Sequence, residues 1–454
     1  MEESRSREIQ QGWFENQNIE TQREANTSSG NENQKEVHRE ENGSIGNGHQ
    51  YRGLVIDITK MLESLEPTLK NEYCIYRVPH HLRKLNDEAY TPRYISIGPF
   101  HHSDKRLQPM EKHKVRNLKS FMSRTNKNLD NLVGTIKGFE TRIRRCYAET
   151  IELSSDDFVK LILMDGSFIV ELFMRKEEGD NLELFDPLSE MGVDLSLLEN
   201  QLPYFVIEKL FELLPPNRFT LAQLTFRYFS FYNIQNISHD SITEIKHFTD
   251  LLRTFQLPPL ERRPQRERTM ISNLYSLTQL CEAGVELKVG SSKCLLDLKF
   301  KNGVLEIPQL SFEDRTEVLV RNVMALELCH YGMHQYVTDY YQILDFLVDT
   351  TKDVDILCDK NIVVNYLGDR DAIKSLVNNL NKEIAWNSSS ADYYKLCEEL
   401  NAYYGEPWHR WKATLRRQYF STPWRIASTI AAVILLVLTL IQTICSIIQI
   451  LPIV

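Results

Sequence analysis

Apolar residues recur at the spacing of a helix face along most of the chain, and this pattern predicts a mainly α-helical fold. The first such run begins near Leu54 and contains Val55, Ile58, Met61, Leu62 and Leu65, with Pro67 ending it. A second run, from Glu111 to Met122, also predicts a helix, and its exposed face is strongly basic.

A buried helix is predicted where apolar residues surround the helix axis most of the way round. Ser154 and Asp157 form a capping box that opens it. Its apolar positions are Phe158, Leu161, Ile162, Phe168, Ile169, Leu172 and Phe173. The segment from Leu195 to Leu214 is similar, and Pro203 is expected to kink it or divide it in two.

The hydrophobic period changes from helix-like to strand-like at residues 285–308. Val285, Leu287 and Val289 alternate with polar residues, as in a strand. Asn302-Gly303 then separates two runs at 294–300 and 304–307, which predicts a β-hairpin. Helical spacing resumes at Glu317 and continues to about Tyr404, with breaks near Thr351 and Gly368. We therefore expect a large helical domain (α+β) that carries a small antiparallel β element.

The C-terminal region carries no charged residue from Ile426 to Val454. A helix from Ile426 to Ile448 would be about 34 Å long, which exceeds a hydrocarbon core of about 30 Å. This predicts one transmembrane helix. Gln442, Thr443 and Ser446 share one of its faces. Either these side chains bond to their own helix, or they form a contact for a partner helix and allow a homo-oligomer.

The charges that flank this span predict its orientation. Basic residues precede it and no charged residue follows: Arg410, Lys412, Arg416, Arg417 and Arg425. The positive-inside rule then places the preceding domain in the cytosol, at the plasma membrane or the endoplasmic reticulum. With about six residues after the helix, insertion is expected to follow translation, as in a tail anchor. Four N-x-S/T sequons, at Asn26, Asn42, Asn236 and Asn387, would be glycosylated only in the inverted topology.

The composition of the chain predicts a disordered N-terminal tail and argues against nucleic acid as a partner. The 454-residue chain has a net charge of −9, unlike a nucleic-acid binder. Residues 1–50 are polar and acidic, with almost no apolar residues, which predicts disorder. We thus divide the chain into a tail at 1–50, a helical domain at 51–405, a juxtamembrane segment at 406–425, the span at 426–448 and a short end at 449–454.

Candidate chemistry is sparse, and we predict no catalytic residue, no cofactor and no metal site. The eight cysteines are scattered without a CxxC pair, as in a reducing compartment. No HExxH, G-x-S-x-G or phosphate-binding loop occurs. Asp165 and Ser167 are expected to bond backbone groups, and Glu199-Asn200-Gln201 to form a structural hydrogen-bond cluster. The arginines around Pro264 suggest either a solvated loop or an anion-binding surface.

Several short blocks carry a resemblance to a known family. They are YRVP at 76–79, YTP at 90–92, IGPFHH at 97–102, MDGSFI at 164–169, LENQLP at 198–203, RNVMALE at 321–327, VTDY at 337–340, DVDIL at 353–357 and YFSTPW at 419–424. From about residue 51 onward, the chain resembles the plant-specific domain of unknown function 247, a UPF0481-type membrane protein family. That family often has Cys where this chain has Ser167, which argues against a thiol mechanism there.

The resemblance implies a plant origin and a membrane location, but no established activity and no catalytic residues. Some grass members are implicated in pollen–stigma self-incompatibility, which is a recognition or signalling process. The leading hypothesis is therefore a membrane-anchored adaptor that binds an unidentified protein partner. A second is an enzyme with a cleft near Arg77, His80, His101 and His102. A third is a lipid or small-ligand binder, which would need an apolar cavity.

Overall fold

The structure is a computed structural model that describes residues 51–64, 72–179, 188–267, 271, 273–384, 389–409, 411, 414–415 and 423–450. The chain divides into two units, Met1–Leu69 and Lys70–Val454. In the first unit the described element is helix α2, Arg52–Ser64, which confirms the helix predicted there. Leu65, Pro67 and the predicted tail at 1–50 lie outside the described residues.

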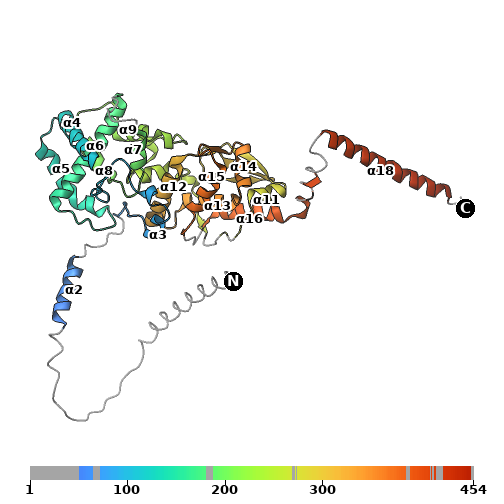
Figure 1. Cartoon of the computed structure of the whole chain (residues 1–454), viewed down its shortest axis with the longest axis horizontal. Coiled ribbons are helices and arrows are strands. Elements are labelled where there is room, and N and C mark those ends of the chain that lie inside the picture. Colours follow the sequence, from blue (N-terminus) through green and yellow to red (C-terminus); the bar gives the residue numbers. More distant parts are fainter. Residues whose placement is uncertain are drawn as a thin grey trace, which may run out of the picture. The chain divides into compact units, whose positions relative to one another are not determined.

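The N-terminal half of the second unit is helical and surrounds α6 (Figure 1). Its helices are α3 His80–Arg83, η1 Asp87–Tyr90, α4 Gln108–Thr125, α5 Leu129–Arg145, α6 Ser155–Glu178, α7 Leu188–Asp194, α8 Tyr204–Phe211, α9 Leu221–Tyr228 and α10 Phe248–Thr254. As predicted, the Ser154 side chain accepts a hydrogen bond from the Asp157 N–H at the start of α6. Helices α4, α5, α8 and α9 all pack on α6, so α6 forms the centre of the first hydrophobic core. On α4, Lys112, Arg116 and Lys119 are exposed, as predicted.

The prediction of a helix from Leu195 to Leu214, kinked or divided at Pro203, is confirmed in the helix that starts after Pro203 and wrong for residues 195–203. Helix α7 ends at Asp194 and α8 starts at Tyr204, so residues 195–203 form an irregular segment. Side chains explain this difference, because Gln201 donates to the backbone oxygens of Leu195 and Leu197 at 2.6 and 2.7 Å. Such side-chain bonds compete with the backbone bonds of a helix.

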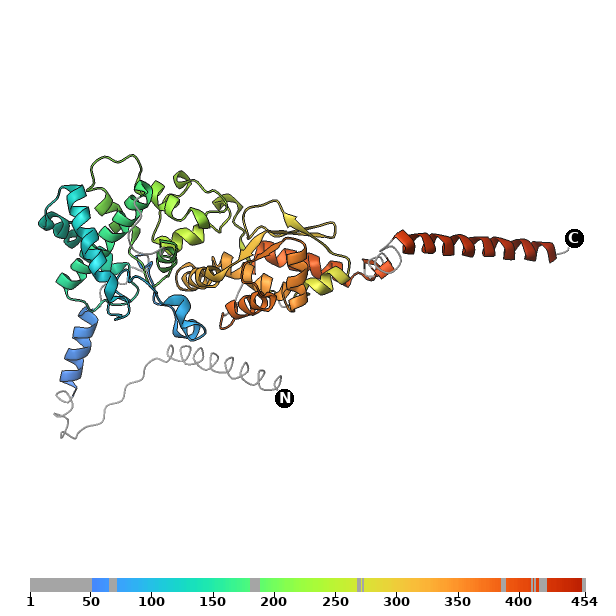
Figure 2. The ribbon, with the colours of Figure 1, turned by 45° about the horizontal axis from the view of Figure 1, so that its top comes forward.

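The C-terminal half combines short strands with helices around a second core. Its strands are β1 Arg266–Glu267, β2 Glu286–Gly290, β3 Lys299–Lys301, β4 Val304–Pro308, β5 Leu310–Phe312, β6 Val363–Asn365 and β7 Ser389–Ser390. The predicted hairpin is confirmed, since β3 and β4 are antiparallel and Asn302 and Gly303 adopt positive φ angles of 52° and 78°. However, β2 pairs with β4 in parallel, so the sheet is mixed rather than antiparallel (Figure 2).

The helices of this half follow the predicted periodicity only from Glu317 onward, and there the strands β6 and β7 interrupt the region predicted as helix. They are η4 Leu260–Arg262, α11 Leu277–Glu282, α12 Asp314–Leu326, a π-helical turn Glu327–Tyr331, α13 Tyr336–Leu347, α14 Thr351–Asp359, α15 Arg370–Leu380 and α16 Ala391–Gly405. The breaks predicted near Thr351 and Gly368 fall between α13 and α14 and before α15. A third, smaller core cluster includes Val78, Leu82, Leu198 and Leu326, which come from both halves. All eight cysteines are free thiols.

The last helix, α18, runs from Pro423 to Ile450 and begins three residues before the predicted span. Its segment Pro423–Ser446 is long and apolar enough to cross a membrane, and none of it is buried in the protein. Thr439 and Thr443 donate hydrogen bonds to the carbonyls of Leu435 and Thr439, one turn back, at 2.7 and 2.8 Å. The Thr443 hydroxyl therefore bonds to its own helix, as the first of the two alternatives predicts, and contact with a partner helix stays a prediction.

Candidate functional site

Two residues of the hypothetical catalytic cleft, Arg77 and His101, meet at one buried carboxylate. The Glu199 side chain is fully buried, and its Oε2 lies 2.7 Å from Arg83 Nη2, 3.2 Å from His101 Nε2 and 3.7 Å from Arg77 Nη1. Its Oε1 accepts a hydrogen bond from the Val78 N–H at 2.7 Å. Burial alone would raise the pKa of Glu199, but hydrogen bonds from His101 and Arg83 lower it below its ordinary value. The carboxylate is therefore held ionised.

The other two residues of that cleft do not join this cluster. His80 starts α3 with an exposed side chain, and His102 Nδ1 lies 2.7 Å from the carbonyl oxygen of Pro99. None of the four cavities described for this structure is lined by the Glu199 cluster. The enzyme hypothesis required four groups converging in a cleft, and instead two arginine side chains and the His101 ring contact one buried carboxylate.

A second buried ion pair joins the MDGSFI block to the IGPFHH block. Asp165 accepts a hydrogen bond from the Gly98 N–H and contacts Lys114 Nζ, both at 2.7 Å, and both charged side chains are fully buried. Burial raises the pKa of Asp165 to about 6, although the Lys114 ammonium and the Gly98 N–H oppose this. Gly98 has φ +74°, and a Cβ there would lie 2.5 Å from the Gln201 carbonyl oxygen, so only glycine fits. Ser167 Oγ, by contrast, has no hydrogen-bond partner among the described residues.

The LENQLP block completes this cluster through bonds to backbone groups. Asn200 accepts from the Ile97 N–H at 2.6 Å and donates to the carbonyls of Ile95 and Asp194 at 3.0 Å. Asp194 accepts three backbone N–H groups, from residues 93–95. The predicted structural hydrogen-bond cluster is confirmed. The blocks near residues 97, 165 and 200 thus hold one another in place, which accounts for their polar residues without catalysis.

A third buried carboxylate connects the two large cores. Glu327 accepts from Arg253 Nε at 2.9 Å, and also from the backbone N–H groups of Val337 and Thr338 at 3.2 and 2.9 Å. Arg253 and Glu327 side chains are 3% and 0% exposed. Because α10 belongs to the first core and α13 to the second, this pair ties the two halves together.

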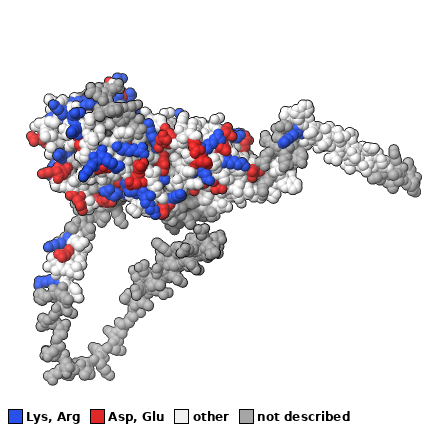
Figure 3. All heavy atoms as spheres, viewed as in Figure 1, with Lys and Arg blue, Asp and Glu red and all other residues white. Residues whose placement is uncertain are grey.

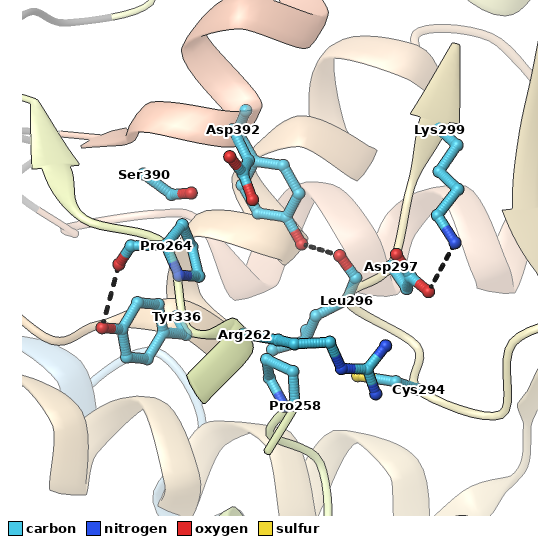
Figure 4. A pocket seen from close by; sticks show the side chains of 11 residues that line it. Pro258, Arg262, Pro264, Cys294, Leu296, Asp297, Lys299, Tyr336, Ser390 and Asp392 are labelled. Atoms are coloured by element: carbon cyan, nitrogen blue, oxygen red, sulfur yellow. Dashed lines mark hydrogen bonds and ion pairs between the residues drawn. The ribbon is translucent and has the colours of Figure 1, made fainter. Parts of the chain in front are cut away.

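A cavity of about 390 Å³ lies between η4, the loop around Cys294 and the start of α16 (Figure 4). Three of its polar side chains are engaged: Tyr393 donates to the Leu296 carbonyl at 2.7 Å, Tyr336 donates to the Pro264 carbonyl at 3.2 Å, and Lys299 pairs with Asp297 at 2.9 Å. The exposed Arg262 makes no hydrogen bond or ion pair with the described part of the chain. Ser390 is 1% exposed, and its Oγ has no partner there either.

The chemistry of this cavity suits a small ligand better than a metal. Its walls combine prolines and tyrosine rings with the Arg262 guanidinium, the Ser390 hydroxyl and the carboxylates of Asp297 and Asp392, and its volume falls within the usual range of ligand sites. No group of three His, Cys, Asp or Glu side chains that could hold a metal ion occurs within the described ranges. The third hypothesis needed an apolar cavity, and this cavity is partly charged.

The predicted membrane residues are only partly visible. The span ends, Ile426 and Ile448, both lie within α18, and Arg425 lies in its first turn. The other predicted basic residues, Arg410, Lys412, Arg416 and Arg417, lie outside the described residues, as does Asn387. Figure 3 shows positive and negative side chains interspersed over the face in view, whereas α18 is almost uncharged.

Sequence reasoning missed three residues that matter here: Arg83, Lys114 and Ser390. In the sequence Lys114 looks like part of a basic helix surface, yet it is one of the buried residues of α4. Its position one turn after Met110 and one turn before Leu118, which both pack on the core, was the available signal. Arg83 and Ser390 gave no such signal, because their partners or neighbours are distant in sequence.

Comparisons with known proteins agree with the resemblance found in the motif blocks. Residues 75–438 match the model of the DUF247 family, described as a plant protein of unknown function. A UPF0481 protein of Arabidopsis thaliana is 26% identical over 419 residues, which cover 84% of this chain and 87% of that protein. A second Arabidopsis thaliana UPF0481 protein is 21% identical, with 81% and 89% covered. No solved structure matches.

Proposed function

This chain belongs to the plant DUF247 family, whose function is unknown, and from that premise we propose that it is a single-pass membrane protein acting through contacts with a protein partner. In this proposal α18 crosses the membrane, the helical unit lies in the cytosol, and the chain catalyses no reaction. The observation that carries the anchor is α18 itself, whose 24-residue segment Pro423–Ser446 is apolar enough to cross a membrane and is not buried in the protein. The basic residues before the span support the cytosolic orientation.

The proposal of a protein partner rests on two features. In the motif blocks, Asp165, Glu199, Asn200 and Gln201 are engaged in internal bonds, which leaves few polar groups there for chemistry on a substrate. Helix α2, considered by itself, has an exposed apolar stripe of the kind that fits a groove on another protein. The stripe consists of Leu54, Val55, Ile58, Met61 and Leu62.

Two arginines in the middle of α18 are expected to release the chain from membranes. Leu435→Arg with Leu436→Arg places two charges near the bilayer centre, each costing about 3 kcal/mol on insertion. We expect the wild-type chain in plant microsomes to resist alkaline carbonate extraction and the double variant to become extractable. Val115→Arg, at an exposed apolar site on α4, should stay in the membrane. Equal extraction of wild type and double variant would refute the anchor.

Glycosylation and crosslinking test the rest of the proposal. Unglycosylated Asn236 and Asn387, with protease digestion from the cytosolic side, would support the orientation, and glycans on both would reverse it. A photocrosslinker at Ile58 should give an adduct larger than the chain, whereas one at Lys60, on the opposite face of α2, should not. A crosslink at Ile58 that joins only segments of the same chain would contradict the partner role of α2.

We also propose a second candidate function, binding of a small amphipathic anion, because the cavity in Figure 4 holds an available arginine and a buried, available hydroxyl. The anion would pair with Arg262, and its apolar body would lie against Pro258, Pro264 and Tyr336. 1-Naphthoate is a suitable probe, followed by saturation-transfer NMR on the full chain in detergent. We expect the wild-type chain to bind the probe, and Arg262→Gln to bind it with about tenfold lower affinity. Arg370→Gln, an exposed arginine elsewhere, serves as the control, and equal signals from all three proteins would exclude this site.

A further inference from the structure

Cys74 and Cys146 lie opposite each other on two neighbouring segments. The Cys74 and Ile75 N–H groups both donate to the Cys146 carbonyl at 2.9 Å, and the Ala148 N–H donates to the Ile75 carbonyl at 3.0 Å. Ile75 and Tyr147 form a parallel β-bridge. The residues just before a bridged pair face each other with side chains on the same side. The two thiols are therefore neighbours that affect each other's pKa, and Cys146 Sγ also donates a weak hydrogen bond to the Arg142 carbonyl at 3.4 Å.

This arrangement matches what a disulfide needs. Bridged cysteines have Cα atoms about 4.4–6.8 Å apart, and neighbouring strands are about 4.8 Å apart. A bond between the two sulfurs would therefore require rotation of side chains rather than movement of the backbone. Both residues are free thiols in this structure.

A solvent-connected cavity gives small molecules access to the pair. Both cysteines line a cavity of about 520 Å³, together with Arg142 and Lys246, although each is less than a tenth exposed. The Cys74 hydrogen bond lowers the pKa of Cys146 against the effect of burial, and the Arg142 charge assists. The same contact and burial raise the pKa of Cys74 well above its ordinary value. Cys146 is thus the better nucleophile and Cys74 the proton donor beside it.

We propose that Cys74 and Cys146 form a dithiol site that hydroperoxides oxidise to a reversible disulfide. The Cys146 thiolate attacks the terminal peroxide oxygen, so that an S–O bond forms, the O–O bond breaks, and an alkoxide or hydroxide leaves and takes up a proton. The Cys74 thiol then loses its proton and attacks Cys146 Sγ, which forms the S–S bond and releases water. Two thiols lose two electrons, and one hydroperoxide is reduced to an alcohol and water, or to two waters.

The disulfide would fasten the beginning of the second unit to the end of α5. Cys74 lies a few residues after the boundary at Leu69–Lys70, and Cys146 immediately follows α5. Oxidation would thereby fix the segment through which the first unit is attached, and it would remove freedom from the unfolded chain. This inference is independent of the proposed membrane anchor and of the partner.

The test uses the full chain, reduced and purified in detergent, and hydrogen peroxide below one equivalent. After quenching with N-ethylmaleimide, peptide mapping should find the linked Cys74 and Cys146 peptides first, about tenfold faster than oxidation of Cys358, a half-buried single thiol. Thioredoxin or dithiothreitol should reverse the bond, and the oxidised chain should melt a few degrees higher.

Single variants separate the roles of the two thiols. Cys74→Ser should leave a sulfenic acid on Cys146 that dimedone traps, whereas Cys146→Ser should leave Cys74 unreactive. Arg142→Gln should slow the reaction while both cysteines remain, which keeps the test valid if a serine variant folds poorly. Oxidation of Cys358 or Cys445 before the pair, or no linked peptide with excess peroxide, would overturn the proposal.

Discussion

Replacing Glu199 with glutamine is expected to lower the free energy of unfolding by about 3 kcal/mol, because the buried carboxylate that Arg83 and Arg77 contact loses its charge. Arg83 and His101 would then face an amide that offers N–H groups instead of a negative oxygen. Only the bond from the Val78 N–H could be kept. Urea denaturation of the full chain in detergent, followed by tryptophan fluorescence, measures the difference.

The matched control for this variant is Glu149→Gln. Glu149 binds the same Arg77, at 2.9 Å, but both side chains are almost half exposed. Exposed pairs contribute about 0–1 kcal/mol, so this variant should unfold almost like the wild type. If both variants lose the same stability, the Glu199 cluster is not the structural element we describe.

The stability of the chain at acidic pH should also depend on the Glu199 carboxyl. The pKa of folded Glu199 is lowered below the ordinary value of 4.5 because His101 and Arg83 stabilise the carboxylate. A depressed pKa means that the unfolded chain binds the proton more tightly, so this stabilisation is present above about pH 4.5 and is lost as the pH falls through the folded pKa. Glu199→Gln should accordingly lose less stability on acidification than the wild type does.

The helices and the hairpin could be predicted because their signals are local. The capping box at Ser154 and the apolar residues of α6 lie within one segment, as do Asn302 and Gly303 with their flanking strands. Elements whose pattern lies within one segment therefore form where the sequence predicts them. The apolar stripe of α2 could be predicted for the same reason.

The mixed sheet could not be predicted because its cause is distant in sequence, and the irregular segment 195–203 could not because its side chains bond to both local and distant backbone groups. Leu195 to Leu202 has the apolar spacing of a helix, but Asn200 and Gln201 bond to backbone groups from residue 95 to residue 248. Likewise, β2 pairs in parallel with β4, on the side of β4 opposite its hairpin partner β3. The alternating pattern of a strand does not indicate which strand will be its neighbour.

The candidate site was predictable only in part, for an electrostatic reason. Charged residues in a motif suggest chemistry, and the sequence could not show that Arg77 and His101 both contact the buried carboxylate of Glu199. The apolar C-terminal helix, by contrast, could be predicted from the composition of its own segment. In this chain, therefore, only the structure shows which charged motif residues form internal ion pairs.

Replacing Glu327 with glutamine is expected to lower the free energy of unfolding by about 3–5 kcal/mol, since it leaves Arg253 as a buried charge without a partner. The carboxylate also accepts the first N–H groups of α13, which favour a negative charge. Because the pair ties the two cores, hydrogen exchange should rise in both α10 and α13. Arg253→Met in the same chain should recover part of the loss, since the unpaired charge is then gone.

Asp355→Asn, which breaks an exposed pair with Arg370, should change stability by less than about 1 kcal/mol. If exchange rises in α13 alone, or Arg253→Met adds its full cost, Glu327 caps a helix and does not couple the two halves.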